Sequence, residues 1–85
     1  MLKIKVEELG NVIIMHLTGK LFLESLNDLT YKWEVMVQKR PCVIAINCAN
    51  LESIDSSSIG TLVKFFNEAM SKDIQLVFYD LNASI

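Results

Sequence analysis

The chain has 85 residues, a formal net charge of −2 at pH 7 and a hydrophobic fraction of 52%. A chain of this length makes one domain with a modest core, so residues 1–85 are expected to form a single domain. A negative net charge without a basic stripe excludes the nucleic-acid-binding class, because such proteins need Lys and Arg to meet phosphates. The apolar fraction is slightly above the usual ~45–50% and fits either a dense core or an apolar surface that meets a partner.

Membrane and secretion signals are not apparent in the sequence. The apolar runs are far shorter than the ~20 residues that cross a bilayer. The first six residues, MLKIKV, lack the apolar region of a signal peptide. We therefore expect a cytoplasmic protein.

Two cysteines, Cys42 and Cys48, bracket a short apolar run that is typical of a strand. In an extended strand they lie roughly 20 Å apart, beyond the ~7 Å between Cα atoms that a disulfide allows. We expect both to be reduced and buried. A metal site is not expected, because His16 is the only histidine and no CxxC motif occurs.

The first two predicted elements form an antiparallel hairpin. Residues 3–7 alternate between apolar and charged side chains, the period of a half-buried strand. Gly10-Asn11 is a two-residue turn signal, and residues 12–18 are rich in β-branched side chains. Gly19 is expected to end the second strand.

Residues 21–39 change to a helical period. Apolar side chains step by four, three, four and three, which is one face of an amphipathic helix. Pro41 cannot continue a helix and disfavours helical geometry at Arg40, so the helix is expected to stop near Lys39. The residues of this face, all expected in the core, are Phe22, Leu26, Leu29, Trp33 and Met36.

A strand, a helix and a strand are predicted in the second half of the chain. Residues 42–48, CVIAINC, are almost continuously apolar, which suits a parallel strand covered on both faces. A loop over 49–57, a helix over 58–71 and a strand over 74–79 follow, and residues 81–85 look like the start of a third helix. The expected core face of the second helix consists of Ile59, Leu62, Val63, Phe66 and Met70.

The predicted order is therefore β-β-α-β-α-β. It indicates an α/β fold in which helices pack on a mixed sheet. In open α/β sheets, sites gather beyond the carboxyl ends of the parallel strands. In this chain that place is the junction between the third strand and the second helix.

Three consecutive serines, Ser56, Ser57 and Ser58, follow Asp55 at this junction. Free N–H groups and the helix dipole attract anions there. A phosphate would add about −1.5 to −2 charge at pH 7 beside Asp55. It would change the surface shown to a partner without unfolding the domain. Capping of the helix by Asp55 or Ser57 explains the same pattern and is favoured on the pattern alone.

The stretch from Ile44 to Leu62 resembles the signature of bacterial STAS domains (sulfate transporter and anti-sigma factor antagonist). In that family an apolar strand leads through a short polar loop to Asp-Ser-Ser/Ala-Gly, then to an apolar residue, Gly and a helix. Gly19-Lys20-Leu21 resembles the family's glycine after its opening strands. The order of elements matches along the whole chain.

The resemblance implies an anti-sigma factor antagonist. In that branch the serine after the aspartate is phosphorylated, which corresponds to Ser56, with Ser57 and Ser58 as alternatives. The unmodified protein binds a serine-kinase anti-sigma factor and frees the sigma factor. Phosphorylation breaks this complex, and a phosphoserine phosphatase restores the antagonist.

The partner-binding surface implied by the resemblance surrounds Ser56. Phe65 is added to it from the helical spacing, because it lies about 100° from Phe66 and outside the expected core face. An exposed aromatic there could anchor a partner, or it could pack beneath further C-terminal residues. The expected partner-binding residues are Asp55, Ser56, Ser57, Ser58, Ile59, Thr61 and Phe65.

Three features depart from the family's pattern. Ser58 stands where the family usually has Gly, and Asn47 replaces an aspartate common at the end of the strand. The chain also stops as a third helix begins, which leaves part of the fold uncovered. Either a second subunit fills this gap, as in a homodimer, or the sequence is part of a longer chain.

Other functions remain open on the sequence alone. A STAS subunit of a membrane transporter complex, or a structural assembly module, would use the same surface without phosphorylation. Enzyme activity and a cofactor are not expected, because a nucleophilic serine needs a positioned base and the chain has no phosphate-binding glycine loop.

Overall fold

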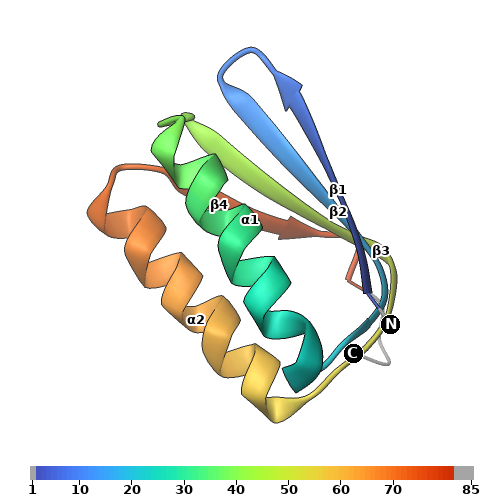
Figure 1. Ribbon diagram of the computed structural model, residues 1–85. Coiled ribbons are helices and arrows are strands. Elements are labelled where there is room, and N and C mark those ends of the chain that lie inside the picture. The colour runs from blue at the N-terminus through green and yellow to red at the C-terminus, as the bar shows by residue number, and fades with distance from the viewer. Residues whose placement is uncertain (1, 82–85) are drawn as a thin grey trace.

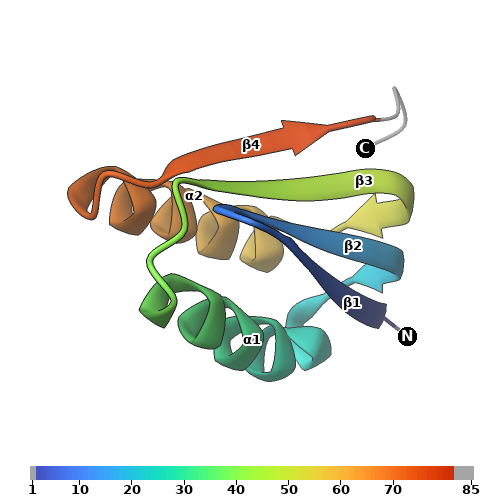
Figure 2. The same cartoon turned by 90° about the horizontal axis from the view of Figure 1, so that it is seen from above.

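The computed structural model describes residues 2–81. Two helices lie on one face of a four-stranded sheet (Figures 1 and 2). The predicted α/β fold and element order are confirmed, with one 3-10 turn (η1) added before the first helix. The elements are β1 (Leu2–Leu9), β2 (Val12–Leu21), η1 (Leu23–Ser25), α1 (Leu26–Gln38), β3 (Val43–Ile54), α2 (Ser56–Ser71) and β4 (Gln75–Tyr79).

The sheet has the strand order β1-β2-β3-β4. β1 and β2 pair antiparallel, whereas β2 with β3 and β3 with β4 pair parallel. Leu9 pairs with Val12, so the hairpin turn is Gly10-Asn11 as predicted. Gly10 has a φ of 62°, a left-handed conformation that favours glycine in a two-residue hairpin turn.

Both central strands run further than the sequence indicates. β2 does not end at Gly19 but continues to Leu21. β3 does not end at Cys48 but continues to Ile54, so the predicted loop over 49–57 is mostly strand.

Long-range pairing explains this extension. The second half of β3, Asn50 to Ile54, pairs with the end of β2 across two register shifts. Such bulges bend a strand and let a polar segment remain in the sheet. The pairing brings Asp55 to Leu21, and the Asp55 N–H donates a hydrogen bond of 3.2 Å to the Leu21 carbonyl.

The core lies between the sheet and the two helices. On α1 the predicted core face is confirmed at Leu29, Trp33 and Met36, which are 0%, 1% and 2% exposed. The Trp33 ring stacks on Phe65 of α2 with the ring centroids 4.4 Å apart and the planes 9° apart. This stack joins the two helices above the sheet.

The expected cover on both faces of the third strand is wrong for the described part of the chain. Figure 2 shows α1 and α2 on the same side of the sheet. The connections β2-α1-β3 and β3-α2-β4 cross the sheet in the same direction and have the same handedness. Both helices therefore lie on one face. Ile44 and Ile46 of β3 are therefore buried, whereas Val43, Ala45 and Asn47 on the other face are half-buried.

The largest departure from the prediction is the orientation of α2. Four of the five residues expected in the core are between 44% and 63% exposed, and only Leu62 packs partly against the core. The helix has two apolar faces. The stack of Phe65 on Trp33 and the small residues Ser58 and Ala69 favour burial of the face that was not predicted. The residues that α2 buries are Ser58, Phe65 and Ala69. The four exposed residues are Ile59, Val63, Phe66 and Met70.

Both cysteines are free thiols. Cys48 is buried as expected, and this burial, together with the negative charge of Asp80, raises the pKa of its thiol. The expectation that Cys42 is buried is wrong, because it is exposed just before β3. The predicted start of a third helix falls mainly on residues 82–85, outside the described residues.

Candidate functional site

Asp55 caps α2 through its side chain. Its Oδ1 accepts hydrogen bonds from the Ser58 N–H at 2.9 Å and from the Ser58 hydroxyl at 2.7 Å. Its Oδ2 accepts one from the Leu23 N–H at 2.9 Å. These hydrogen bonds, with that of the Ser58 hydroxyl the strongest, lower the pKa of the Asp55 carboxyl. The predicted cap is confirmed, and the carboxylate also ties η1 to α2.

Ser58 is a structural residue in the first turn of α2. It is fully buried at 0% exposure. Its hydroxyl also lies 2.9 Å from the Leu21 carbonyl oxygen, so one hydrogen is shared between this oxygen and Asp55. The side chain that replaces the family's usual glycine thus fastens α2 to the end of β2.

Ser56 and Ser57 are the exposed hydroxyl residues of the site. Within the described part of the chain, neither hydroxyl takes part in a hydrogen bond. Both residues occupy the first turn of α2, where backbone N–H groups and the helix dipole favour negative charge. The structure therefore brings two accessible hydroxyls to a position suited to an anion.

Ile59, Gly60 and Thr61 continue the surface beyond Ser56. Ile59 is 54% exposed and Thr61 is half-buried. A Cβ atom at Gly60 would have no atom within 4 Å, so the fold itself does not require glycine there. Glycine inside a helix costs about 1 kcal/mol relative to alanine, but it lets another surface approach the backbone closely.

The expectation of an exposed Phe65 is wrong. Phe65 is 4% exposed and stacks on Trp33, whereas its neighbour Phe66 is 44% exposed. Phe65 therefore cannot contact a partner without opening the core. The error follows from the choice of the wrong apolar face of α2.

Asn47 and His16 form a polar row on the sheet face opposite the helices. The Asn47 side chain accepts a hydrogen bond of 2.9 Å from the Ala49 N–H, so its amide group donates to Nδ1 of His16 at 3.0 Å. Nε2 of His16 then donates to Glu7 at 3.0 Å. An aspartate at position 47 has no N–H and could not donate to His16 in this way.

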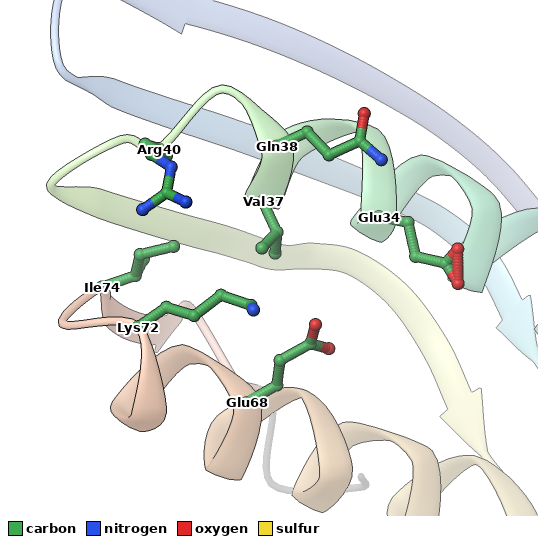
Figure 3. A pocket seen from close by; sticks show the side chains of 7 residues that line it. All are labelled: Glu34, Val37, Gln38, Arg40, Glu68, Lys72 and Ile74. Atoms are coloured by element: carbon green, nitrogen blue, oxygen red, sulfur yellow. The ribbon is translucent and has the colours of Figure 1, made fainter.

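The cavity in Figure 3 lies at the other end of α2 and contains none of the predicted site residues. It has a volume of about 340 Å³ and lies between the carboxyl ends of the two helices. Among residues 2–81, no group of acidic, His and Cys side chains could hold a metal ion. No helix in the same range is both long and apolar enough to cross a membrane.

Solved structures similar to this chain include anti-sigma factor antagonists. One from Mycobacterium paratuberculosis has a TM-score of 0.81 and 17% identity, covering 92% of this chain and 66% of that one. The antagonist SpoIIAA in its unphosphorylated form has a TM-score of 0.81 and 17% identity, covering 96% of this chain and 76% of that one. SpoIIAA of Bacillus in the phosphorylated form has a TM-score of 0.80.

A longer protein, Mglu, contains a similar fold with a TM-score of 0.82 and 14% identity. The match covers 93% of this chain but only 20% of Mglu. At such identities the likeness shows the fold alone, and no curated protein matches the chain. The STAS domain model, however, matches residues 3–85. The chain therefore belongs to the STAS domain family.

Proposed function

We propose that this protein is a cytoplasmic anti-sigma factor antagonist that is switched by phosphorylation of Ser56. Unmodified, it binds a serine-kinase anti-sigma factor through the amino end of α2 and frees the sigma factor. The kinase phosphorylates Ser56 and the complex dissociates, and a phosphoserine phosphatase restores the antagonist. The observation that carries the proposal is the exposed hydroxyl of Ser56 directly after the Asp55 cap.

Burial separates Ser58 from Ser56 and Ser57 as a phosphate acceptor. The Ser58 hydroxyl is buried and bonded, so a kinase could reach it only after the first turn of α2 opens. Ser56 and Ser57 are both exposed, but the resemblance to the antagonist branch implies modification at the serine directly after the aspartate, which is Ser56. We therefore assign the phosphate to Ser56 and keep Ser57 as the alternative.

Phosphorylation of Ser56 changes the surface rather than the fold. A phosphate at the amino end of a helix interacts favourably with the free N–H groups and the dipole. It also places a charge of about −1.5 to −2 next to the ionised Asp55. A partner surface made for a neutral serine would then meet a concentrated negative charge.

The proposed docking surface consists of Asp55, Ser56, Ser57, Ile59, Gly60 and Thr61. Ile59 offers an apolar anchor beside the acceptor. Gly60 leaves room for the partner next to the helix backbone. The fold shared with known anti-sigma factor antagonists supports an anti-sigma factor as the partner, and the choice of these residues is part of the proposal.

The proposed role is binding rather than catalysis. A serine nucleophile needs a base to accept its proton. His16 hydrogen-bonds to Glu7 and Asn47 on the opposite sheet face. Asp55 is a weak base because its hydrogen bonds lower the pKa of its carboxyl.

The proposal is tested with the purified chain, ATP and the serine-kinase anti-sigma factors of its source. Mass spectrometry is expected to find phosphate on Ser56, and none after Ser56→Ala. Ser57→Ala is the matched control, because it removes the neighbouring exposed hydroxyl and should leave phosphorylation intact. Calorimetry should show at least a roughly tenfold weaker complex after phosphorylation, since an added charge at a docked surface is costly.

Two results would count against this scheme. Phosphate on Ser57 in both the wild type and Ser56→Ala would move the switch by one residue. If no candidate kinase binds or phosphorylates the chain, the antagonist function is excluded, and a transporter subunit or an assembly module is favoured.

A further inference from the structure

Within residues 2–81, an exposed apolar surface runs along α2. Four side chains follow one another at intervals of four, three and four residues, which places them in one line on the helix. Their exposed fractions are 54%, 54%, 44% and 63%. We call these residues the α2 stripe: Ile59, Val63, Phe66 and Met70.

The α2 stripe borders a groove between α2 and the end of β4. The groove has a volume of about 330 Å³. Leu62, Phe78 and Leu81 complete it, and every residue that lines it is apolar. Leu81 is itself 58% exposed, so the apolar surface extends from the helix to the residues that follow β4.

The size of this surface is that of a small interface. With about 150–200 Å² of accessible area per large side chain, the α2 stripe and Leu81 expose on the order of 450 Å². The largest apolar patch on a typical monomer is roughly 300–600 Å² and is often functional. Two such patches face to face, with their flanking residues, would bury about 1,000 Å², the lower bound for a specific interface.

The charged residues of α2 and of its carboxyl-terminal cap lie away from the α2 stripe. Lys64 and Glu68 of the helix and the cap residue Lys72 line the cavities between α2 and α1. Two α2 stripes can therefore pack together without burying a charge or opposing like charges. Gly60 lies on the flank of the stripe and leaves space for a second helix to approach.

We propose that a second copy of this chain covers the α2 stripe, with the two α2 helices antiparallel about a two-fold axis. The spacing of the stripe is symmetric, so Ile59 would lie opposite Met70 of the second copy and Val63 opposite Phe66. Each short β-branched side chain then meets a longer one, which fills the interface evenly. A parallel pair would instead oppose Phe66 to Phe66 and Val63 to Val63, which leaves crowding at one level and a gap at another.

This dimer does not depend on the proposed function, because it involves neither ATP nor a kinase. Sedimentation velocity of the unmodified chain is expected to show a monomer–dimer equilibrium between micromolar and millimolar concentration. Val63→Asp should raise the dissociation constant at least roughly tenfold, because it buries an unpaired charge. Tyr31→Asp, at an exposed aromatic of α1 that is 68% accessible, is the matched control and should leave the equilibrium unchanged.

A monomer at every concentration would overturn the proposal and leave the groove to another partner or to a segment that follows Leu81. A dimer that withstands Val63→Asp would overturn it as well. Circular dichroism of each variant checks that the fold is retained.

Disulfide trapping tests the antiparallel arrangement separately. In a Cys42→Ser background, Ile59→Cys and Met70→Cys variants are prepared one by one and then mixed under mild oxidation. The antiparallel dimer brings these two positions together, whereas it separates the two copies of either one, and a disulfide needs Cβ atoms about 4 Å apart. Cross-linking between unlike variants supports the arrangement. Cross-linking within each variant alone, at an equal or higher rate, would overturn it.

Discussion

A single carboxylate organises the site at the residue scale. Asp55 accepts hydrogen bonds from Ser58 in α2 and from Leu23, which is 32 residues away in the sequence. It therefore holds the first turn of α2 and η1, the turn that follows β2, in one arrangement. The serine that we propose as the phosphate acceptor follows directly, so the acceptor is presented by a fixed backbone.

The contribution of Asp55 to stability should depend on pH. Its hydrogen bonds lower the pKa of the carboxyl in the folded protein below the unfolded value of ~3.9. The stabilisation is therefore present above the unfolded pKa and is lost as the pH falls through the folded pKa. We expect Asp55→Ala to lower the urea midpoint at pH 7 and the difference from the wild type to shrink below about pH 4.

Glu52→Ala is the matched control for this measurement. Glu52 is an exposed residue of β3 three positions earlier, and its carboxylate makes no hydrogen bond within the range 2–81. Its removal should change the midpoint little at either pH. A difference between Asp55→Ala and the wild type that stays constant from pH 7 to pH 3 would show that the ionised carboxylate is not what stabilises the junction.

The sequence predicts the local part of this site but not the long-range part. Asp55 before an apolar helix identifies the cap, because capping acts within three residues. The bond to Leu23 and the burial of Ser58 against Leu21 depend on how β2 and β3 pair. Nothing in the local pattern around Ser58 indicates that contact.

At the scale of the elements, α2 shows why spacing alone can mislead. The helix carries two apolar faces about 100° apart, and either satisfies the period of a buried helix. The structure buries the face of Phe65, whose ring stacks on Trp33, and exposes the face of Phe66. Which face is buried depends on how α2 packs against α1, and the sequence of α2 alone does not show this packing.

Alanine substitution of the two neighbouring phenylalanines distinguishes these faces. Phe65→Ala removes a buried, stacked ring and should lower the free energy of unfolding by about 3–5 kcal/mol. Phe66→Ala should change it by no more than about 1 kcal/mol, because its ring is already partly exposed. Urea denaturation at a concentration below dimer formation measures both.

The larger loss is a sizeable share of the roughly 4–13 kcal/mol expected for a chain of this length. If Phe65→Ala is too unstable to measure, Phe65→Leu gives the same comparison with a smaller change. Equal losses at the two positions would mean that α2 is rotated relative to the orientation described above.

The strands show which parts of the sheet can be predicted from the sequence and which cannot. The opening hairpin is predictable because alternation and a glycine turn are local signals. The second half of β3, Asn50 to Ile54, is polar and irregular, and it is a strand only because the end of β2 lies beside it. Likewise, the apolar run of β3 predicts burial but not that both described helices occupy one face of the sheet.

At the scale of the whole molecule, the two proposals overlap at Ile59 and the neighbouring Gly60. Ile59 belongs to the docking surface next to Ser56 and also to the α2 stripe, where Met70 of a second copy would cover it. One copy therefore cannot use Ile59 for both contacts at once. Self-association and kinase binding then become competing equilibria, in which each lowers the apparent affinity of the other.

This competition predicts how phosphorylation depends on concentration. Below the dissociation constant of the dimer, the wild type and Val63→Asp should be phosphorylated at equal rates, because Val63 is not part of the docking surface. Above it, the wild type should fall behind Val63→Asp, while Tyr31→Asp should follow the wild type. Initial rates measured with radiolabelled ATP over a series of antagonist concentrations test this. Identical curves for all three proteins, when the wild type is shown to be dimeric in the same buffer, would mean that the kinase docks without displacing the second copy and that Ile59 is not shared.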